Sequence, residues 1–325
     1  MTRVVVVGSF NLDHAWSVAS LPRPGETLGG QYASGPGGKG FNQAVAAARF
    51  GAGTTFLCAL GTDAAGEAAR TMAEAEGIDL RASRSDAATG TAGIFVAADG
   101  ANSIVVAPGA NADLAPAFVE AQADRIAGAG VLLVQLEVPL PAVHAALRAA
   151  RAAGVPTILD PAPADAATTA ELLALCDILT PNETEFAALV HRHVGRRIES
   201  SDVAGLDDAT LHALCRALLP AGHVVVTLGG AGCFASHPAG APDQGEAGAP
   251  APFQRMAPEP VAAVDTTGAG DAFDGALAAS IALDARAPLH RHLRFAGRYA
   301  ALSTERAGAA TAMPRRADLL ARFGA

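Results

Sequence analysis

Short runs of β-branched and aliphatic residues recur along the chain, each bounded by Gly, Pro or Asp, and Ala-rich stretches of helical length lie between them. Strands buried on both faces read as continuous apolar runs, and parallel strands are joined by crossover helices. This alternation therefore predicts an α/β fold with a mostly parallel central sheet covered on both faces. The expected strands are 4–7, 131–136, 157–159, 177–180 and 224–228, and the expected helices include 43–50, 142–153 and 169–175.

Two segments break this alternation. Residues 12–33 contain two prolines and several glycines and no convincing helix. Residues 91–107 are typical of a hairpin, with two apolar strands joined through Asp99 and Gly100. Both segments fit a small accessory sheet that forms a lid over an active site. The expected division is a discontinuous α/β core of residues 1–10, 34–90 and 108–325 and a β lid of residues 11–33 and 91–107.

Composition narrows the class of protein. The chain has 325 residues, half of them apolar, which is enough for a large core without disulfides. Its formal net charge of −9 argues against nucleic acid as a partner, because nucleic-acid binding requires clustered Lys and Arg. The four cysteines lie far apart in apolar runs without a CxxC pair, so we expect buried free thiols and a reducing cytoplasm.

The sequence carries no signal for a membrane. Its N-terminal apolar run is too short for a signal peptide, and no stretch of about 18 apolar residues is free of charges and turn residues. We therefore expect neither a membrane span nor a membrane partner. Residues 237–252 are dominated by Ala, Gly and Pro without periodicity, which predicts a surface loop.

The string VDTTGAGDAFDGALAASIAL near the C-terminus is the strongest candidate site. An apolar strand is expected to end at Asp265, and a helix of small residues is expected to begin at about Asp271. Between them, the backbone amides of Gly268, Ala269 and Gly270 are placed to stabilise negative charge on a transferred phosphoryl group. Asp271 is either the base that accepts the proton of an attacking hydroxyl or an N-cap of the helix.

Two other strings in the sequence argue against a Walker A loop and against a dinucleotide site. GGKG is not a Walker A loop, because Lys39 is followed by Gly40 where Ser or Thr should hold Mg²⁺. GSFNLD, which follows the first expected strand, lacks the glycines of a dinucleotide site, so an oxidoreductase is disfavoured. TPNETE follows another expected strand, and the spacing of Asn182 and Glu185 predicts a capping box at the start of a helix.

Taken together, the motifs resemble those of the ribokinase (PfkB) family of carbohydrate kinases. DTTGAGDAF resembles its C-terminal signature, and GPGGKGFNQAVAAARFGA resembles its N-terminal signature. Further matching strings, in the expected order, are GSFNLD, PRPGET, ALGTDAAGE, APGAN, QLEVPL, TPNETE and TLGGAG. The resemblance implies a core of βαβ units with a β-sheet lid, ATP and Mg²⁺ as cosubstrates, and transfer of the γ-phosphate to a primary hydroxyl.

The same resemblance implies the substrate residues. Asp271 is the base, and the turn of Gly268, Ala269 and Gly270 holds the phosphoryl group. Carboxylates and amides suit a polyol, because they satisfy several hydroxyl groups in fixed directions. The implied sugar ligands are Asn11, Asp13, Gly38, Lys39, Asn42 and Glu137, with Asp271 at the reacting hydroxyl. The expected substrate is the 5-hydroxyl of D-ribose, giving ribose 5-phosphate, and lid strands are expected to pair in a homodimer.

Nucleotide and metal ligands are also implied by the resemblance. Glu185 orients Mg²⁺ through water, and K⁺ acts as an activator beside the anion-binding turn. Ala312 stands where the family commonly has Ser, so one K⁺ ligand is lost unless Thr311 compensates. The implied ATP residues are Asn182, Thr227, Gly229, Gly232, Gly270 and Gly297, and the implied K⁺ residues are Asp265 and Thr267 with carbonyls of Ser303, Arg306 and Gly308.

Some positions depart from the family and keep alternatives open. Gly230 and Gly297 stand where bulkier side chains are frequent, which predicts a more open adenine pocket. Phe41 replaces the usual Ala, and its ring would narrow the sugar pocket or stack on a base. Asp274 replaces the usual Asn and adds a negative charge. The alternatives are a kinase of the same fold for another sugar or a nucleoside, and a non-catalytic sensor of sugar or nucleotide.

Overall fold

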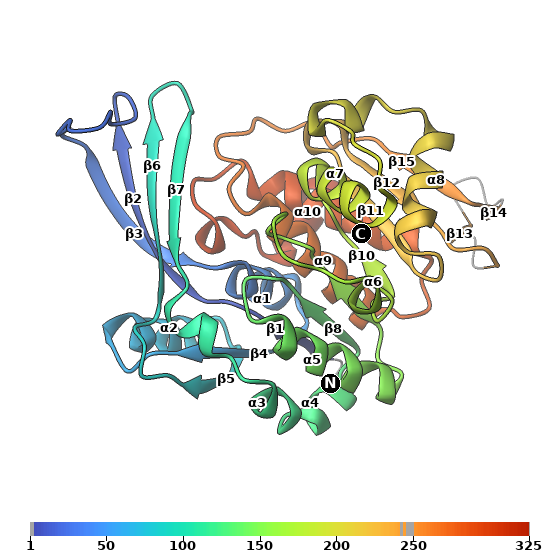
Figure 1. Cartoon of the computed structure of the whole chain (residues 1–325), viewed down its shortest axis with the longest axis horizontal. Coiled ribbons are helices and arrows are strands. Elements are labelled where there is room, and N and C mark those ends of the chain that lie inside the picture. Colours follow the sequence, from blue (N-terminus) through green and yellow to red (C-terminus); the bar gives the residue numbers. More distant parts are fainter. Residues whose placement is uncertain (1–2, 241–242, 245–249, 325) are drawn as a thin grey trace.

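In the computed structural model, which describes residues 3–240, 243–244 and 250–324, nine strands form one large sheet (Figure 1). Their order is β15-β12-β11-β10-β9-β8-β1-β4-β5. All pairs from β11 to β5 are parallel, and β12 and β15 join the edge antiparallel, which confirms the predicted mostly parallel sheet. The strands are β1 Arg3–Val7, β4 Gly53–Leu60, β5 Asp79–Arg84, β8 Val131–Val134, β9 Thr157–Leu159, β10 Ile178–Leu179, β11 His223–Thr227, β12 Cys233–Ser236 and β15 Phe253–Met256.

Helices cover both faces of this sheet and make three layers. Alternate residues of each strand point to opposite faces, so Val4 and Val6 lie in one hydrophobic core while Val5 and Val7 lie in the other. Helices α1 Lys39–Phe50, α2 Ala64–Ala75, α9 Ala269–Leu283, α10 Leu289–Ser303 and α11 Arg316–Phe323 pack on the first face. Helices α3 Pro116–Glu120, α4 Ala123–Ala127, α5 Leu140–Ala153, α6 Ala170–Leu173, α7 Glu183–Leu189 and α8 Asp208–Leu218 pack on the second.

Single helical turns connect several of these elements. The 3₁₀ segments are η1 Gly109–Asp113, η3 Ser200–Gly205, η4 Gly229–Ala231 and η5 Ala310–Ala312, and the π-helical segment η2 Val190–Val194 continues α7.

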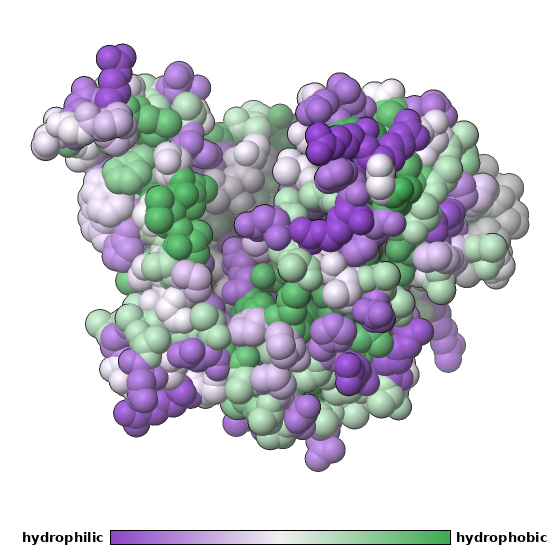
Figure 2. Space-filling model, in the orientation of Figure 1, coloured by the Kyte–Doolittle hydropathy of each residue, from purple (hydrophilic) through white to green (hydrophobic). Residues whose placement is uncertain are grey.

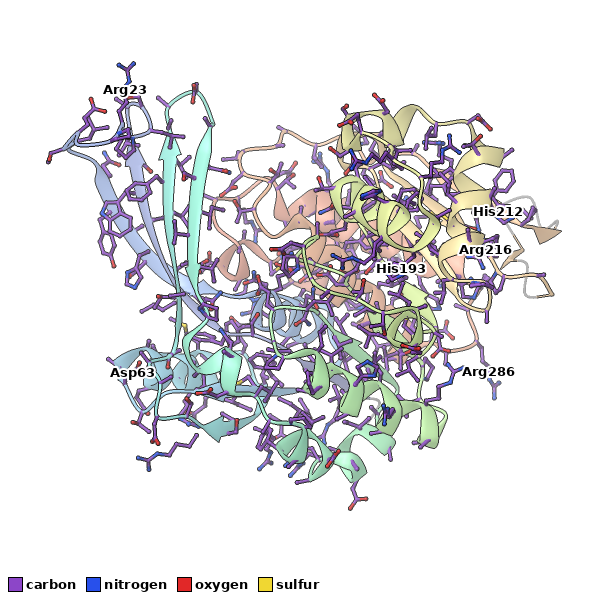
Figure 3. The ribbon with its side chains drawn as sticks, in the orientation of Figure 1. Arg23, Asp63, His193, His212, Arg216 and Arg286 are labelled. Carbon is purple, nitrogen blue, oxygen red and sulfur yellow. The ribbon has the colours of Figure 1, made fainter. Side chains whose placement is uncertain are left out.

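A small four-stranded sheet rises from one end of the large sheet (Figure 1). Its order is β3-β2-β6-β7, and β6 and β7 form the predicted antiparallel hairpin. Asp63 ties this sheet to the core, because its carboxylate caps α2 through the Gly66 amide and also accepts from the Thr89 amide and hydroxyl, just before β6 (Figure 3). The strands are β2 Asn11–Val18, β3 Gln31–Gly37, β6 Gly90–Ala97 and β7 Asn102–Ala107.

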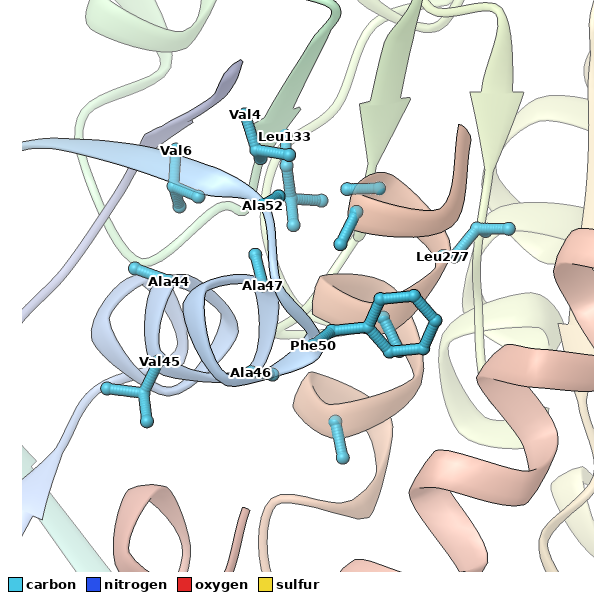
Figure 4. Packing of buried hydrophobic residues seen from close by; sticks show 14 of the residues in the cluster. Val4, Val6, Ala44, Val45, Ala46, Ala47, Phe50, Ala52, Leu133 and Leu277 are labelled. Carbon is cyan, nitrogen blue, oxygen red and sulfur yellow. The ribbon is translucent and has the colours of Figure 1, made fainter. Parts of the chain in front are cut away.

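Close contact between α1 and α9 positions the residues discussed below. A Cβ atom on Gly275 would lie 2.5 Å from the Ala46 Cβ and 2.5 Å from the Gln43 carbonyl oxygen. Only glycine allows this approach, and Figure 4 shows the small side chains of α1, Ala46 among them, that line the contact. The first turn of α9 is thereby held against the first turns of α1.

Three boundaries differ from the sequence-based expectation. The strand expected before Asp265 is absent: the Val264 and Asp265 amides both donate to the Thr304 carbonyl, at 2.7 and 3.0 Å, and Val264 is 70% exposed, so this segment is a loop. Helix α1 begins at Lys39 instead of residue 43, because Gly38 adopts a φ of 84° that ends β3 immediately before it. The helix expected at 169–175 is reduced to α6.

Part of the loop predicted at 237–252, residues 241–242 and 245–249, lies outside the described residues. Of the described part, β13 Asp243–Gln244 pairs with β14 Pro250–Ala251. Among the helices in the described part of the chain, none combines the length and apolar character needed to cross a bilayer. The four cysteines are free and buried, as predicted.

Candidate active site

Polar residues gather where the parallel strands end. Parallel strands direct their carboxyl ends to one edge of a sheet, and ligand sites in such sheets form there. Gln135 follows β8, Asp160 follows β9, and Asn182 follows β10. Strand β1 continues through Ser9 into β2, whose first residue is Asn11. The large sheet and the base of the small sheet thus meet at this edge.

Asp271 lies in the first turn of α9 and is buried. Its Oδ2 accepts a hydrogen bond of 2.8 Å from Asn42 Nδ2, and its Oδ1 accepts one of 3.1 Å from Gln43 Nε2. The N-cap of α9 is Gly268, with a φ of 73° and no side-chain cap. The capping interpretation of Asp271 is therefore wrong, because its carboxylate is held by α1 and not by the amides of its own helix.

The surroundings of Asp271 tune its basicity. Burial raises its pKa to about 6; the charge on Lys39 and the hydrogen bond from Asn42 lower it, and the charges on Asp160 and Glu137 raise it. Asp271 is therefore ionised at neutral pH and a stronger base than an exposed aspartate.

The turn before Asp271 presents backbone amides. Ala269 N–H donates to the Thr266 carbonyl at 3.2 Å and closes the turn. The N–H groups of Gly268 and Gly270 have no partner within the described residues. Of the three amides predicted to bind an anion, these two are therefore available at the positive end of the α9 dipole, and the Ala269 amide is engaged.

Three buried residues that the sequence did not single out complete the network. Gln43 Nε2 donates to Asp160 Oδ2 at 2.9 Å, and Gln135 Nε2 donates to Gln43 Oε1 at 2.6 Å. Lys39 Nζ lies 4.0 Å from Asp160 Oδ2. Asp160 directly follows the expected strand 157–159 and Gln135 lies near the end of the expected strand 131–136, so their position at strand ends was a usable signal. Gln43 gave none, because only its helix face distinguishes it from a surface glutamine.

Three residues predicted to bind the sugar come from β2, which carries Asn11 and Asp13, and from the loop after β8, which carries Glu137. Asn111 Nδ2 donates to Asn11 Oδ1 at 2.9 Å, which leaves the Asn11 amino group to donate to a ligand. Glu137 Oε2 accepts from Ser9 Oγ at 2.5 Å and from the Lys39 amide at 3.0 Å. Burial, then the charges on Glu137 and Asp271, raise the pKa of Asp13 to about 7. Asp13, Glu137 and Asp271 are thus close enough to influence one another.

The ammonium group of Lys39 is the cation among these carboxylates. Burial alone would lower its pKa, but Asp160, Asp271, Glu137 and Glu185 raise it above its usual range. Gly38 and Gly40 allow this loop to lie against β1: a Cβ on Gly38 would lie 2.7 Å from the Asn11 nitrogen, and a Cβ on Gly40 would lie 2.6 Å from the Ser9 nitrogen. Lys39 is therefore a partly buried cation that interacts with several carboxylates.

Phe41 does not face this site. It is 1% exposed, and its ring lies 5.2 Å from that of Phe10, edge to face, and 5.9 Å from that of Phe56. The expectation that Phe41 narrows the pocket or stacks on a base is wrong, because its place on α1 directs the ring into the core between α1 and β4.

The predicted capping box at the start of α7 is confirmed. Asn182 Oδ1 accepts from the Thr184 and Glu185 amides at 2.9 Å, and Glu185 Oε2 accepts from the Asn182 amide at 2.9 Å. Glu185 is buried, which raises its pKa, although hydrogen bonds from Asn182 and the charge on Lys39 oppose that shift. Asn182 forms a parallel bridge with Thr227, so two predicted nucleotide residues lie side by side.

Several glycines lie next to these residues, and their surroundings differ. Gly229 and Gly232 have φ values of 49° and 87°, and a Cβ on Gly232 would lie 2.0 Å from the Met256 carbonyl oxygen. A Cβ on Gly230 or on Gly297 in α10 would meet no atom within 4 Å. Side chains at those two positions would enter open space.

Asp265 joins two segments of the predicted K⁺ site. Its Oδ1 accepts from the Thr267 amide at 2.9 Å and hydroxyl at 2.7 Å, and its Oδ2 accepts from the Gly308 amide at 2.8 Å. Burial alone would raise the pKa of Asp265, but these hydrogen bonds lower it below the usual value. Ala312 is buried and Thr311 is exposed. A fixed negative charge beside the anion-binding turn suits a monovalent cation.

The arrangement defines a class of protein. The buried carboxylate of Asp271 lies in the first turn of a helix whose Gly268 and Gly270 amides have no partner within the described residues, and the carboxylates of Asp13, Glu137 and Glu185 lie near enough to interact with it. Such a site deprotonates a hydroxyl group and binds an anionic group next to it. These are the requirements of an α/β enzyme that transfers a phosphoryl group.

Comparison with known proteins identifies the family. The model of the pfkB family of carbohydrate kinases matches residues 1–316. A ribokinase of Haemophilus influenzae is 38% identical over 321 residues, which cover 98% of this chain and 97% of that protein. The bifunctional ribokinase/ribose-5-phosphate isomerase A of Fructilactobacillus sanfranciscensis is 37% identical over 329 residues, and the match covers 98% of this chain and 56% of that longer protein.

A solved structure agrees with this match. Arabidopsis thaliana ribokinase complexed with ribose and ATP superposes with a TM-score of 0.79 at 32% identity, covering 99% of this chain and 98% of that one. The chain belongs to the pfkB family of carbohydrate kinases.

Proposed function

We propose that this protein is an ATP-dependent sugar kinase that transfers the γ-phosphate to the 5-hydroxyl of D-ribose, giving ribose 5-phosphate and ADP. One observation carries the assignment: the buried carboxylate of Asp271, held by Asn42 and Gln43, lies directly after a turn with free amides. Relatives that match over nearly their full length are ribokinases, and the Arabidopsis structure holds ribose and ATP.

The chemistry follows from the positions of the groups. The ionised Asp271 accepts the proton of the ribose hydroxyl as its oxygen forms a bond to the γ-phosphorus and the bond to the ADP oxygen breaks. The amides of Gly268 and Gly270 stabilise the charge on the transferred group. Ribose is held by the donors and acceptors of its proposed ligands, which are Asn11, Asp13, Gly38, Lys39, Asn42 and Glu137.

A lid is part of this proposal. The lid consists of residues 11–33 and 91–107, which make up most of the small sheet. The rest of the chain forms the core. Closure excludes water from the phosphoryl group and so prevents wasteful hydrolysis. Asn11 and Asp13 lie on β2 at the base of this sheet, so a sugar bound to them also favours the closed lid.

The nucleotide binds on the other side of Asp271. Asn182 and Thr227, which form a bridge, approach the phosphates, and Gly229, Gly232 and Gly270 let the backbone approach closely. The open space at Gly297 accepts the adenine ring. Glu185 suits Mg²⁺ bound mainly through phosphates and water, because a hard cation prefers carboxylate oxygen and the carboxylate already lies at the capping box. Bound there, Mg²⁺ would neutralise part of the charge on the phosphates.

The substrate is tested by ATP consumption with ribose, deoxyribose, fructose, adenosine and other nucleosides at equal concentrations. We expect the highest kcat/KM for ribose. A nucleoside that reacts far better than ribose would transfer the assignment to a nucleoside kinase, and binding without turnover of any compound would indicate a sensor. The burial of Phe41 removes the main sequence argument for a nucleoside.

The loss of activity at acidic pH is expected to follow the protonation of Asp271. The pKa of Asp271 is raised to about 6, and the ionised form is the active one, so activity is present above this pH and is lost below it. We expect log kcat/KM for ribose to fall by about one per pH unit below about pH 6. Rates are measured with excess Mg²⁺ so that ATP stays complexed. A profile that is level from pH 5 to pH 8 would contradict the role of Asp271.

K⁺ is expected to activate the enzyme. Asp265 and Thr267, with carbonyls of Ser303, Arg306 and Gly308, are proposed to hold it. Replacing K⁺ with Na⁺ should lower kcat by about tenfold, equivalent to about 1.4 kcal/mol in the barrier.

Matched variants test this K⁺ site. Asp265→Asn should abolish the difference between K⁺ and Na⁺, and Ala312→Ser should increase it by adding a hydroxyl ligand. Equal kcat in the two salts for the unmodified protein would rule out the site.

We also propose a homodimer in the cytoplasm that pairs through the small sheet. His14, Trp16, Tyr32 and Phe95 stack on one face of this sheet, with the Trp16 ring 5.3 Å from those of Tyr32 and Phe95, and Tyr32 is 55% exposed. Hydrophobic side chains also gather on β7 (Figure 2). Light scattering after size exclusion should give twice the chain mass, and Trp16→Glu should give a monomer. Leu320→Glu, on α11, is the control that stays dimeric.

A further inference from the structure

A second aspartate of α9 lies behind the catalytic base. Asp274 is one turn further along the helix than Asp271 and is 3% exposed. Its Oδ1 is buried and has no hydrogen-bond partner in the described part of the chain. An ionised carboxylate accepts hydrogen bonds at both oxygens, so a buried oxygen without a donor is costly.

The groups that act on Asp274 come from every neighbouring element of the site. Asp160 follows β9, Thr180 follows β10, Lys39 begins α1, and Asp271 precedes it on α9. On its other side α9 packs against α10 through apolar residues such as Leu293 and Ala296. The Thr180 hydroxyl is itself within 3.4 Å of the Leu159 carbonyl. Two carboxylates favour the proton on Asp274, and the hydrogen bond from Thr180 and the ammonium group of Lys39 oppose it.

Negative charge is in excess throughout this site. The ammonium group of Lys39 faces several carboxylates, and they cannot all stay ionised in a buried space. The carboxyl side chains are Asp13, Glu137, Asp160, Glu185, Asp271 and Asp274. Burial raises the pKa of Asp274 well above the usual range, with Asp160 adding to the shift, and burial raises the pKa of Asp160 to about 7. Protons are thus expected within this group of carboxyls at neutral pH.

We propose that Asp274 is a protonated positioning residue that stays neutral behind Asp271. Its neutrality keeps a further negative charge away from the base, so Asp271 is the group of α9 that ionises. The role in catalysis rests on the proposed function of Asp271. The protonation itself does not.

Infrared spectroscopy of the whole protein, without ligands, tests the proton directly. The protein is labelled with ¹³C at the aspartate side-chain carboxyls, and the carbonyl band of a protonated carboxylic acid is recorded at pH 7. We expect this band in the unmodified protein, shifted by the label, and a lower intensity in Asp274→Asn. A spectrum of Asp274→Asn with the band at full intensity would overturn the proposal.

A second variant keeps the test independent of how well Asp274→Asn folds. Asp160→Asn removes the charge that favours the proton on Asp274. The band of the protonated carboxyl should therefore disappear at a lower pH than in the unmodified protein. A spectrum of Asp160→Asn without this band throughout the titration would assign the proton to Asp160 and overturn the proposal.

Stability and activity give further readouts. The raised pKa of Asp274 means that folding takes up a proton near neutral pH, so this residue lowers stability progressively as pH rises from the unfolded pKa to the folded one. Asp274→Asn should raise Tm more at pH 8 than at pH 5. In Asp274→Asn, kcat/KM should also fall at the same acidic pH as in the unmodified protein, because a neutral amide replaces a neutral carboxyl group. A fall that moves to lower pH would indicate an ionised Asp274 and overturn the proposal.

These outcomes separate the inference from the proposed function. If ribose proves to be no substrate, the infrared band and the pH dependence of Tm still decide the state of Asp274. If Asp274 proves to be ionised, turnover of ribose would still support the assignment as a kinase.

Discussion

Replacing Asp271 with asparagine is expected to lower kcat by about 10²- to 10⁴-fold, the usual contribution of general-base catalysis. Asparagine has the same shape but cannot accept the proton of the hydroxyl. The fold should tolerate it: Asn42 and Gln43 donate to the carboxylate, and Asn42 Oδ1, which has no partner within the described residues, can accept from the new amide once the Asn42 side chain turns.

Separate measurements of binding and turnover check this prediction. Calorimetry should give a Kd for ribose close to that of the unmodified protein, while a coupled assay gives the loss in kcat. Asp271→Glu is a useful companion, because it keeps a carboxylate but moves it from the hydroxyl, and its kcat should also be low. Near-normal turnover in Asp271→Asn would rule out Asp271 as the base.

Replacing Gly275 with alanine is expected to have the second-largest effect. The new Cβ would lie 2.5 Å from both the Ala46 Cβ and the Gln43 carbonyl oxygen, so α1 and α9 must separate. Overpacking of this kind costs about 1–3 kcal/mol of folding free energy. Because α9 carries Asp271 and α1 carries Asn42 and Gln43, separation also misplaces the base, which can reduce kcat by about 10²-fold for a shift of about 1 Å.

A matched control distinguishes contact from helix propensity. Gly297→Ala makes the same change in α10, where a Cβ meets no atom within 4 Å, so folding should be as stable or more stable by up to about 1 kcal/mol. Thermal denaturation of the two variants measures the difference. A Gly275→Ala protein as stable as Gly297→Ala would show that the helices are not in the close contact described here.

Much of the fold was predicted from local patterns in the sequence. The alternation of apolar runs and Ala-rich stretches predicted the parallel sheet, because a buried strand and its crossover helix each leave a recognisable pattern in sequence. The spacing of Asn182 and Glu185 predicted a capping box, which depends only on neighbours along the chain. The strand expected before Asp265 was wrong, since the apolar residues there are exposed and their amides bond to Thr304.

By itself, the sequence determined the fold class, the family and the place of Asp271 after a glycine turn, because these depend on short-range order. Only the tertiary structure decided what each side chain faces. Packing against Phe10 and Phe56 directs Phe41 into the core, and the packing of α1 against α9 directs Gln43 toward Asp271. The same packing removes Asp271 from a capping role and buries Asp274 among carboxylates. The contacts of Asp271 with Asn42 and Gln43 join residues 229 and 228 positions apart, which no local pattern records.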